Sequence, residues 1–242
     1  MSFLIQPVGD SAIKVLFTEE VSEKLSNTIQ AFCKTLAYIE IKGVTEWVPA
    51  YNSVTIYYQP IHISFLNLKS TIKQIFDRLA VQDTITFRIV KVPVLYGEKY
   101  GPDLERIATF HNLTTDEVIQ VHQQPDYLIY MLGFLPGFPY LGGLDKRIAT
   151  PRLDEPRSLV EAGSVGIAHE QTGIYPVSSP GGWNIIGNSP LRLFDPKNEI
   201  MPFLFKPGDR IRFYAITVKE YEDIYHQVMA GMYSPSIEEV KR

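Results

Sequence analysis

Two arginines that follow prolines are the side chains of this sequence best suited to bind an anion. Arg152 and Arg157 lie in the segment TPRLDEPR. A planar guanidinium can hold both oxygens of a carboxylate or phosphate, and a neighbouring proline restricts the backbone that carries it. The alternative is an ion pair with Asp154, Glu155 or Glu161, which lie close by in the sequence. The sequence leaves both interpretations open.

His122 is the candidate for proton transfer. It follows the apolar Val118 and Val121 near the end of an expected helix, and it precedes the strand that leads into GFLPGF. An imidazole titrates near neutrality, so it can act as a general base or a proton relay. The alternative is a histidine that ends a helix and bonds to a backbone carbonyl.

Residues 133–187 favour loops of fixed shape over a flexible linker. They hold ten of the 16 glycines but one lysine, and rigid loops are where binding sites usually lie. Tyr140, Tyr175 and Trp183 could wall a pocket there or fill the interior of a barrel. Ser179 has no base at a telling distance in the sequence, so a serine nucleophile is not expected.

Familiar cofactor motifs are missing from the sequence. It contains no phosphate-binding G-x-x-x-x-G-K-[ST], no dinucleotide-binding G-x-G-x-x-G after a strand, no H-E-x-x-H and no G-x-S-x-G. The five histidines include no pair at helical spacing, and the single Cys33 excludes a cysteine cluster, so we expect no metal site. Cys33 lies among apolar residues at helical spacing and is expected to be a core thiol.

Charge and hydropathy argue against nucleic acid and membrane as partners. The formal net charge of -4 gives no broad attraction to phosphate backbones or anionic lipid. Residues 104–123 have the spacing of a helix-turn-helix, but acids open the second helix. No run approaches the roughly 20 apolar residues that span a bilayer. The N-terminus has no basic leader, and we expect a cytoplasmic protein.

The first half of the chain, residues 1–84, is expected to form an α+β domain. Strand patterns flank turns at residues 9–11 and 49–52. Apolar residues recur at helical spacing after Thr18, which could cap a helix, and again over residues 64–80. Two helices on one face of a small sheet are the natural packing.

The second half, residues 85–242, is expected to be mainly β. A strand pattern opens it, and Thr114 and Glu117 have the spacing of a capping box for a helix. From Asp126 onward, short β-rich runs alternate with turn signals, a rhythm typical of a barrel or sandwich. The last dozen residues, around SPSIEEVKR, suggest a disordered charged tail.

Several motifs occur together and in order: VHQQPDYLIYMLGF, GFLPGFPYLGGL, TPRLDEPR, VEAGSVGIA and QTGIYPVSSPGGWNIIG. With them the chain resembles the family of 5-oxoprolinase B subunits, also called allophanate hydrolase subunit 1 or KipI-type sporulation-kinase inhibitors. The resemblance covers nearly the whole chain and is dense over residues 118–190. It implies an α+β fold, in which a small N-terminal α/β domain (1–84) precedes a cyclophilin-like β-barrel of carboxyltransferase C/D type (85–242).

The resemblance also implies a function and partners. Members assemble with homologous C subunits and with A subunits into an ATP-dependent 5-oxoprolinase, which opens 5-oxo-L-proline to L-glutamate. This chain would be inactive alone, with ATP bound at the level of the complex. One alternative is a regulatory protein that inhibits autophosphorylation of a sensor histidine kinase. Another is an allophanate hydrolase or urea carboxylase-like carboxyltransferase component.

With that resemblance, the candidate residues take definite roles. His122 would transfer a proton, Arg152 or Arg157 would hold a carboxylate or phosphoryl oxygen, and the turn before Trp183 would offer backbone donors to an oxyanion. GFLPGF and SPGGW would shape one concave face of the barrel. The substrate-binding candidates are Phe134, Tyr140, Tyr175, Ser179, Gly181, Gly182 and Trp183.

Overall fold

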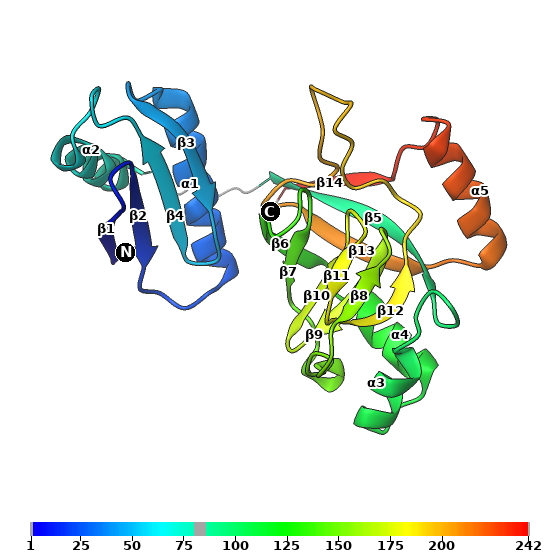
Figure 1. Cartoon of the computed structure of the whole chain (residues 1–242). Helices are drawn as coiled ribbons and strands as arrows, with labels where there is room; N and C mark the ends of the chain where they lie inside the picture. The colour runs from blue at the N-terminus through cyan, green and yellow to red at the C-terminus, as the bar shows by residue number, and fades with distance from the viewer. Residues whose placement is uncertain (1, 80–85, 242) are drawn as a thin grey trace. The chain divides into compact units, whose positions relative to one another are not determined.

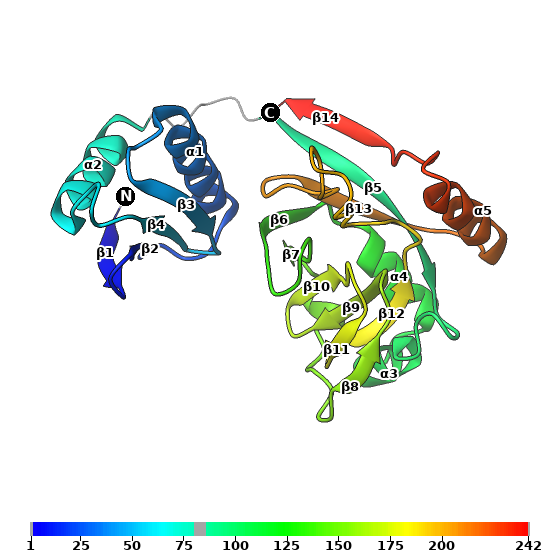
Figure 2. The ribbon, with the colours of Figure 1, turned by 45° about the horizontal axis from the view of Figure 1, so that its top comes forward.

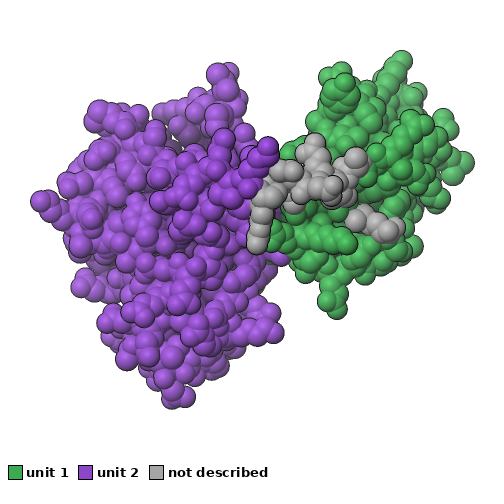
Figure 3. Space-filling view, turned by 180° about the vertical axis from the view of Figure 1, so that it is seen from behind, with its two compact units in different colours: residues 1–85 green, residues 86–242 purple. Residues whose placement is uncertain are grey.

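The computed structural model describes residues 2–79 and 86–241. The chain divides into two compact units, Met1–Ile85 and Thr86–Arg242, which Figure 3 shows in different colours. Each unit has a hydrophobic core of its own.

The first unit is a four-stranded antiparallel sheet with two helices on one face (Figures 1 and 2). The strand order is β1-β2-β4-β3. Alternate strand residues such as Ile13, Val15 and Ile56 are fully buried under the helices, because successive side chains of a strand point to opposite faces. The elements are β1 (Phe3–Val8), β2 (Ala12–Phe17), α1 (Glu23–Ile39), β3 (Val44–Pro49), β4 (Ser53–Tyr58) and α2 (Phe65–Arg78).

The first helix begins later than the sequence suggested. Its N-cap is Ser22, whose hydroxyl accepts a hydrogen bond from the Leu25 N–H at 3.2 Å. The expected cap, Thr18, instead donates its hydroxyl to the Ser2 carbonyl at 3.2 Å, so it joins the two ends of the first hairpin. Cys33 packs against the core of the first unit, as expected for a core thiol. Burial raises the pKa of this thiol to about 12, so it is protonated at neutral pH.

Seven strands of the second unit close into a barrel, in the order β12-β9-β10-β7-β6-β13-β5 and back to β12. The long β5 closes it: β13 runs parallel to it on one side, and on the other β14 pairs with its beginning and β12 with its end. Figure 2 shows β14 alongside β5. The strands are β5 (Thr86–Tyr96), β6 (Tyr127–Leu132), β7 (Pro139–Gly142), β9 (Ser164–Ala168), β10 (Gln171–Ile174), β12 (Asn184–Asn188), β13 (Arg210–Ala215) and β14 (Ile237–Lys241).

The remaining elements cover the barrel. Helices α3 (Leu104–His111) and α4 (Thr115–Gln123) contribute Ile107 and Val118 to its core, and Thr114 and Glu117 form the predicted capping box. A ribbon of β8 (Arg157–Val160) and β11 (Ser179–Gly181) forms a separate small sheet. A 3-10 turn (Lys146–Ile148) and helix α5 (Val218–Met229) complete the unit. The barrel, the small sheets and the helices confirm the expected α+β class.

The C-terminal segment corrects the expectation of a disordered tail, because β14 adds to the sheet there. An acidic side chain of β14 forms ion pairs with basic side chains of β5 and β13. Glu238 lies 2.6 Å from the Lys91 ammonium and 3.2 Å from the Arg212 guanidinium. A charged sequence pattern does not reveal such pairing, because both partners are distant in the chain.

The wall formed by β9, β10 and β12 separates two hydrophobic clusters. Neighbouring residues of a strand point to opposite faces. Ile186 accordingly belongs to the barrel core, whereas Ile185 belongs to a second cluster. This outer aromatic cluster consists of Phe138, Val160, Ala168, Tyr175, Trp183 and Ile185.

Gly187 allows β12 and β5 to meet where the barrel closes. A Cβ there would lie 2.6 Å from Val94 Cγ1 and 2.8 Å from the Leu95 carbonyl oxygen. We expect Gly187→Ala to lower the free energy of unfolding by about 2 kcal/mol or more, because the backbone must move to relieve the overlap. Denaturant unfolding of the whole chain measures this.

Gly133→Ala is the matched control, since its Cβ would meet nothing closer than Tyr140 at 3.9 Å. Its effect should stay within about 0.5 kcal/mol. Equal losses for the two variants would contradict the role of Gly187 in closure.

Candidate functional site

Edge-to-face rings build the outer aromatic cluster. Phe138 meets Tyr175 and Trp183 with ring centroids 5.4 Å apart in both cases and interplanar angles of 87° and 86°. The β10 residue behind them is Gly173, where a Cβ would lie 3.0 Å from the Phe138 ring. Glycine is therefore what lets the rings lie flat on the barrel wall. Tyr175 and Trp183 are almost wholly buried, so only their edges can line a site.

The more open aromatic candidates lie at the rim of this cluster. Tyr140 is half-buried, with its ring 5.2 Å from Phe138. Phe134 is 69% exposed and has a φ of 66°, a left-handed conformation that is uncommon for a bulky residue. Phe134 thus lies in GFLPGF as an exposed ring above the packed ones.

The SPGGW turn is held by hydrogen bonds from both sides. The Trp183 N–H bonds to the Tyr175 hydroxyl, and the Gly182 carbonyl accepts the Leu153 N–H at 2.8 Å. Gly181 is required by this arrangement, since a Cβ there would lie 2.4 Å from the Tyr175 hydroxyl oxygen. The Trp183 N–H thus has a hydrogen-bond partner within this chain.

Ser179 is buried in β11, and its hydroxyl reaches the Pro180 carbonyl at 3.3 Å. Ser178 donates to the Glu161 carboxylate at 3.2 Å and accepts the Ala162 N–H at 3.1 Å. Neither hydroxyl meets a histidine in the part of the chain that the structure describes.

Arg157 forms an ion pair, but with a partner that the sequence did not suggest. Its Nη2 lies 2.7 Å from the Asp103 carboxylate, not beside Asp154, Glu155 or Glu161. The other Asp103 oxygen accepts the Ile185 N–H at 2.6 Å. Arg157 Nη1 also reaches the Trp183 carbonyl at 3.5 Å. These bonds join β8, β12 and the start of α3.

Asp103 is the residue that sequence reasoning missed. It stands at the N-cap position of α3, where an aspartate usually bonds to the helix N–H groups, yet its side chain makes no capping bond. Instead it is 6% exposed and turned toward β12. The segment GPDLER predicts the helix start, but not the partner far along the chain.

Arg152 has a different environment from Arg157. It is exposed and makes no hydrogen bond or ion pair with any residue in 2–79 or 86–241. Burial raises the pKa of Tyr140 and of Tyr175, and the positive charge of Arg152 partly offsets both shifts, so Arg152 lies within electrostatic range of the two phenols. An exposed guanidinium of this kind can hold both oxygens of a carboxylate or phosphate.

His122 lies on the other side of the barrel wall, fully buried in the core of the second unit. Its Nε2 is 2.9 Å from the Thr172 hydroxyl, and its Nδ1 is 2.8 Å from the Tyr96 hydroxyl. Since Thr172 donates to the Gly166 carbonyl at 3.0 Å, it must accept from Nε2–H, which leaves Nδ1 to accept from Tyr96. The expected bond from the ring to a backbone carbonyl is therefore absent from the described contacts of His122.

Burial lowers the pKa of His122 to about 3, so the imidazole is neutral at physiological pH. The structure brings Arg152, Arg157, Tyr140, Tyr175 and Trp183 together on the outer face of the barrel. It does not bring His122 to them.

Within residues 2–79 and 86–241, no group of three or more histidine, cysteine, aspartate or glutamate side chains could hold a metal ion. Among the helices of the same ranges, none has both the length and the apolar character that crossing a bilayer requires.

Asp103→Asn tests the buried ion pair. The substitution leaves Arg157 without its charged partner, so we expect the free energy of unfolding to fall by about 2 kcal/mol. Asp145→Asn is the control, because the Asp145–Arg147 pair lies at the surface, where solvent screens both charges, so its loss should change stability little. Similar small losses for both variants in denaturant unfolding would show that the Asp103 pair is not structural.

His122 predicts a pH dependence of stability. Its folded pKa of about 3 lies below the ordinary value of 6.5, so the unfolded chain binds the proton more readily between these values. Stability should therefore fall as the pH drops below about 6.5, by up to about 1.4 kcal/mol per pH unit from this residue.

Unfolding curves between pH 7 and pH 4 measure this slope, which His122→Gln should reduce. His226→Gln, at an exposed position of α5, should leave it unchanged. An imidazole NMR titration of His122 with a midpoint near 6.5 would contradict the buried neutral state.

Comparison with known proteins places this architecture in a family. The family model described as carboxyltransferase domain, subdomain C and D, matches residues 3–205. The 5-oxoprolinase B subunit of Bacillus subtilis is 42% identical over 232 residues, which cover 90% of this chain and 95% of that protein.

Solved structures give the same placement. TTHA0988 aligns with a TM-score of 0.75 and 36% identity over 88% of this chain, which spans 40% of the TTHA0988 chain. The Kluyveromyces lactis urea amidolyase aligns with a TM-score of 0.83 over 99% of this chain and 16% of its own, and at 20% identity it shares the fold. The chain belongs to the carboxyltransferase-domain family of subdomains C and D, together with the 5-oxoprolinase B subunits.

Proposed function

We propose that this chain is a subunit of an ATP-dependent 5-oxoprolinase that hydrolyses 5-oxo-L-proline to L-glutamate together with the A and C subunits. The names of its relatives support the assignment. The observation that carries a role for this chain is the free guanidinium of Arg152 beside Tyr140 and Tyr175. It is suited to the carboxylate of 5-oxoproline.

The chemistry explains why several subunits would be needed. An unstrained lactam is a poor electrophile, and phosphorylation of its amide oxygen by ATP activates the carbonyl carbon. Water then adds to this carbon, the C–N bond breaks with release of the amine, and the resulting acyl phosphate is hydrolysed to the carboxylate and phosphate. The sequence contains no familiar nucleotide-binding motif, so we assign ATP to the complex and not to this chain alone. The chain is then inactive by itself.

The candidate residues divide by location. Arg152 binds the substrate carboxylate, and the edges of Tyr140, Tyr175 and Trp183 wall its apolar ring. Arg157 holds the SPGGW turn in place through the Trp183 carbonyl. His122 lies on the inner side of the wall, so proton transfer falls to another group of the complex.

Arg152→Gln tests this function in the reconstituted enzyme. With the A and C subunits present, release of ADP that depends on 5-oxoproline should require this chain. The substitution should lower kcat/KM by about 30-fold, mainly through KM, because a charge-assisted hydrogen-bond pair contributes about 2 kcal/mol. Arg147→Gln, whose arginine is paired with Asp145, is the matched control and should keep full activity.

Two results would overturn the proposal. Unchanged KM for Arg152→Gln removes the carboxylate site. ADP release that is unaffected by omission of the chain removes the oxoprolinase role, and inhibition of a sensor histidine kinase by the same preparation would then favour the regulatory alternative.

A carboxyltransferase role is the second candidate. It is favoured by the fold shared with urea amidolyase over almost the whole chain. Urea is neutral, but its carboxylated product carries a carboxylate, so the Arg152 guanidinium suits this role as well and does not separate the two candidates. Activity that depends on biotin carboxylase and not on the A and C subunits would distinguish it.

A further inference from the structure

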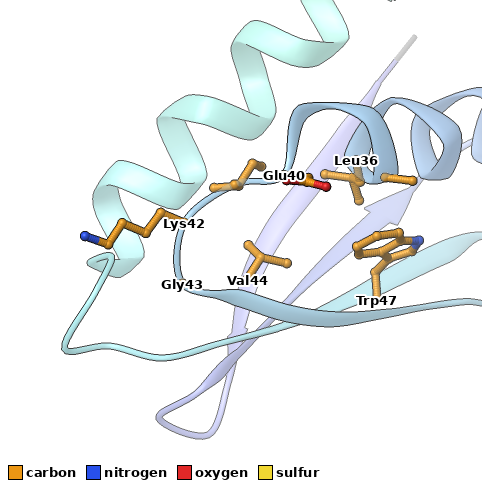
Figure 4. Close-up of a pocket in the computed structure, with 8 residues that line it drawn as sticks. Leu36, Glu40, Lys42, Gly43, Val44 and Trp47 are labelled. Carbon is orange, nitrogen blue, oxygen red and sulfur yellow. The ribbon is translucent and has the colours of Figure 1, made fainter.

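The first unit has a cleft of about 300 Å³ that the proposed function does not use (Figure 4). It lies where α1 ends and the chain turns through Lys42 and Gly43 into β3. Its walls include Leu36, Val44 and Trp47. We propose that this cleft binds an organic cation, an ammonium or guanidinium group carried on a short apolar stem.

Glu40 supplies the charge for such a ligand. It makes no hydrogen bond or ion pair with the residues that the structure describes. Figure 4 places it between Leu36 and the turn, on the side where Val44 and Trp47 lie. A carboxylate at the rim of an apolar cleft attracts a cation and fixes the orientation of its head group.

The position of Glu40 runs against local preference in two ways. It ends α1 with a φ of 48°, a left-handed conformation for which glycine or asparagine is usual. It also adds negative charge at the end of a helix where the dipole is already negative, and the last turn of α1 has no basic residue. Residues that break local rules without compensation are candidates for function.

Trp47 completes the cation site. It is half-buried, and its indole forms a wall of the cleft. Tryptophan is the best aromatic partner for a cation placed over its face. The nearby ammonium of Lys42 does not fill the site, since its side chain extends away from Trp47 (Figure 4).

The size of the cleft limits the ligand. About 300 Å³ is at the lower end of small-molecule sites, which suits a stem of four or five atoms and not a nucleotide or cofactor. A free amine and the basic side chain of a peptide share this chemistry, so the probes below include both.

The test uses the two tryptophans of the chain, which give two indole N–H signals in an ¹⁵N NMR spectrum of the full-length protein. Trp47→Phe assigns the signal of interest. Butylammonium should shift the Trp47 signal with a dissociation constant of about the millimolar range, as the few atoms of the probe permit. Butanol, with the same stem and no charge, should bind at least about five-fold more weakly.

Three substitutions separate charge from fold, with ionic strength held constant. Glu40→Gln should weaken butylammonium binding about ten-fold, whereas Lys42→Gln should strengthen it about two-fold by removing a like charge. Glu46→Gln, at an exposed β3 position outside the cleft lining, is the matched control and should change nothing.

The results that overturn the proposal are equal binding of butanol and butylammonium, or an unchanged affinity in Glu40→Gln. Either would make the cleft an apolar depression without charge selection. An acetylated and amidated Ala-Lys-Ala peptide, compared with Ala-norleucine-Ala, then identifies the source. Tighter binding of the lysine peptide than of butylammonium indicates a basic segment of a partner, and weaker binding indicates a free amine.

Discussion

A single wall of β-sheet with a different set of side chains on each face organises the second unit. In β9, β10 and β12 the alternation of a strand sends Ile167, Thr172 and Ile186 inward and Ala168, Gly173 and Ile185 outward. Gly173 has no side chain, so aromatic rings can lie against the outer face. Because a shift of one residue in register would exchange the two faces, the same pairing that builds the core also fixes the site.

Arg157 and Arg152 lie in one short motif, yet Arg157 forms an ion pair and Arg152 is exposed. The burial of Asp103, the partner of Arg157, explains this difference. A buried carboxylate such as Asp103 is stable only when its charge is compensated and its oxygens are hydrogen-bonded. Arg157 and the Ile185 N–H meet that requirement, so Arg157 is committed to holding the loops together. Arg152 makes no ion pair with the residues that the structure describes and is exposed. His122 is also a buried polar side chain with all its hydrogen bonds made. Two hydroxyls bond to its ring nitrogens, and burial keeps the imidazole uncharged.

Local signals predicted local structure, whereas long-range pairing stayed hidden. The Thr114–Glu117 capping box and the two hairpins of the first unit depend on residues within a few positions of one another, and the sequence revealed them. The choice of a barrel over a sandwich came from the resemblance to a family, and the strand order came only from the structure. Asp103 and Arg157 lie 54 positions apart, and Glu238 pairs with Lys91 from the far end of the chain. Residues so far apart in the chain follow no spacing pattern that a sequence reveals. The sequence therefore named candidate residues by their types, but it could not show which of them lie close together.

The exposure of Arg152 accounts physically for the need for partner chains in the proposed enzyme. In water, an exposed guanidinium and a carboxylate attract each other by only about 1 kcal/mol, because the solvent screens both charges. The same pair is several-fold stronger once a second surface excludes water, as an active site must also do to protect a phosphorylated intermediate. Tyr140, Phe134 and Arg152 form an open rim above a packed aromatic base. In the proposed enzyme, such a rim would bind its ligand weakly alone and more strongly once a partner chain covered it, so desolvation would be the constraint on activity.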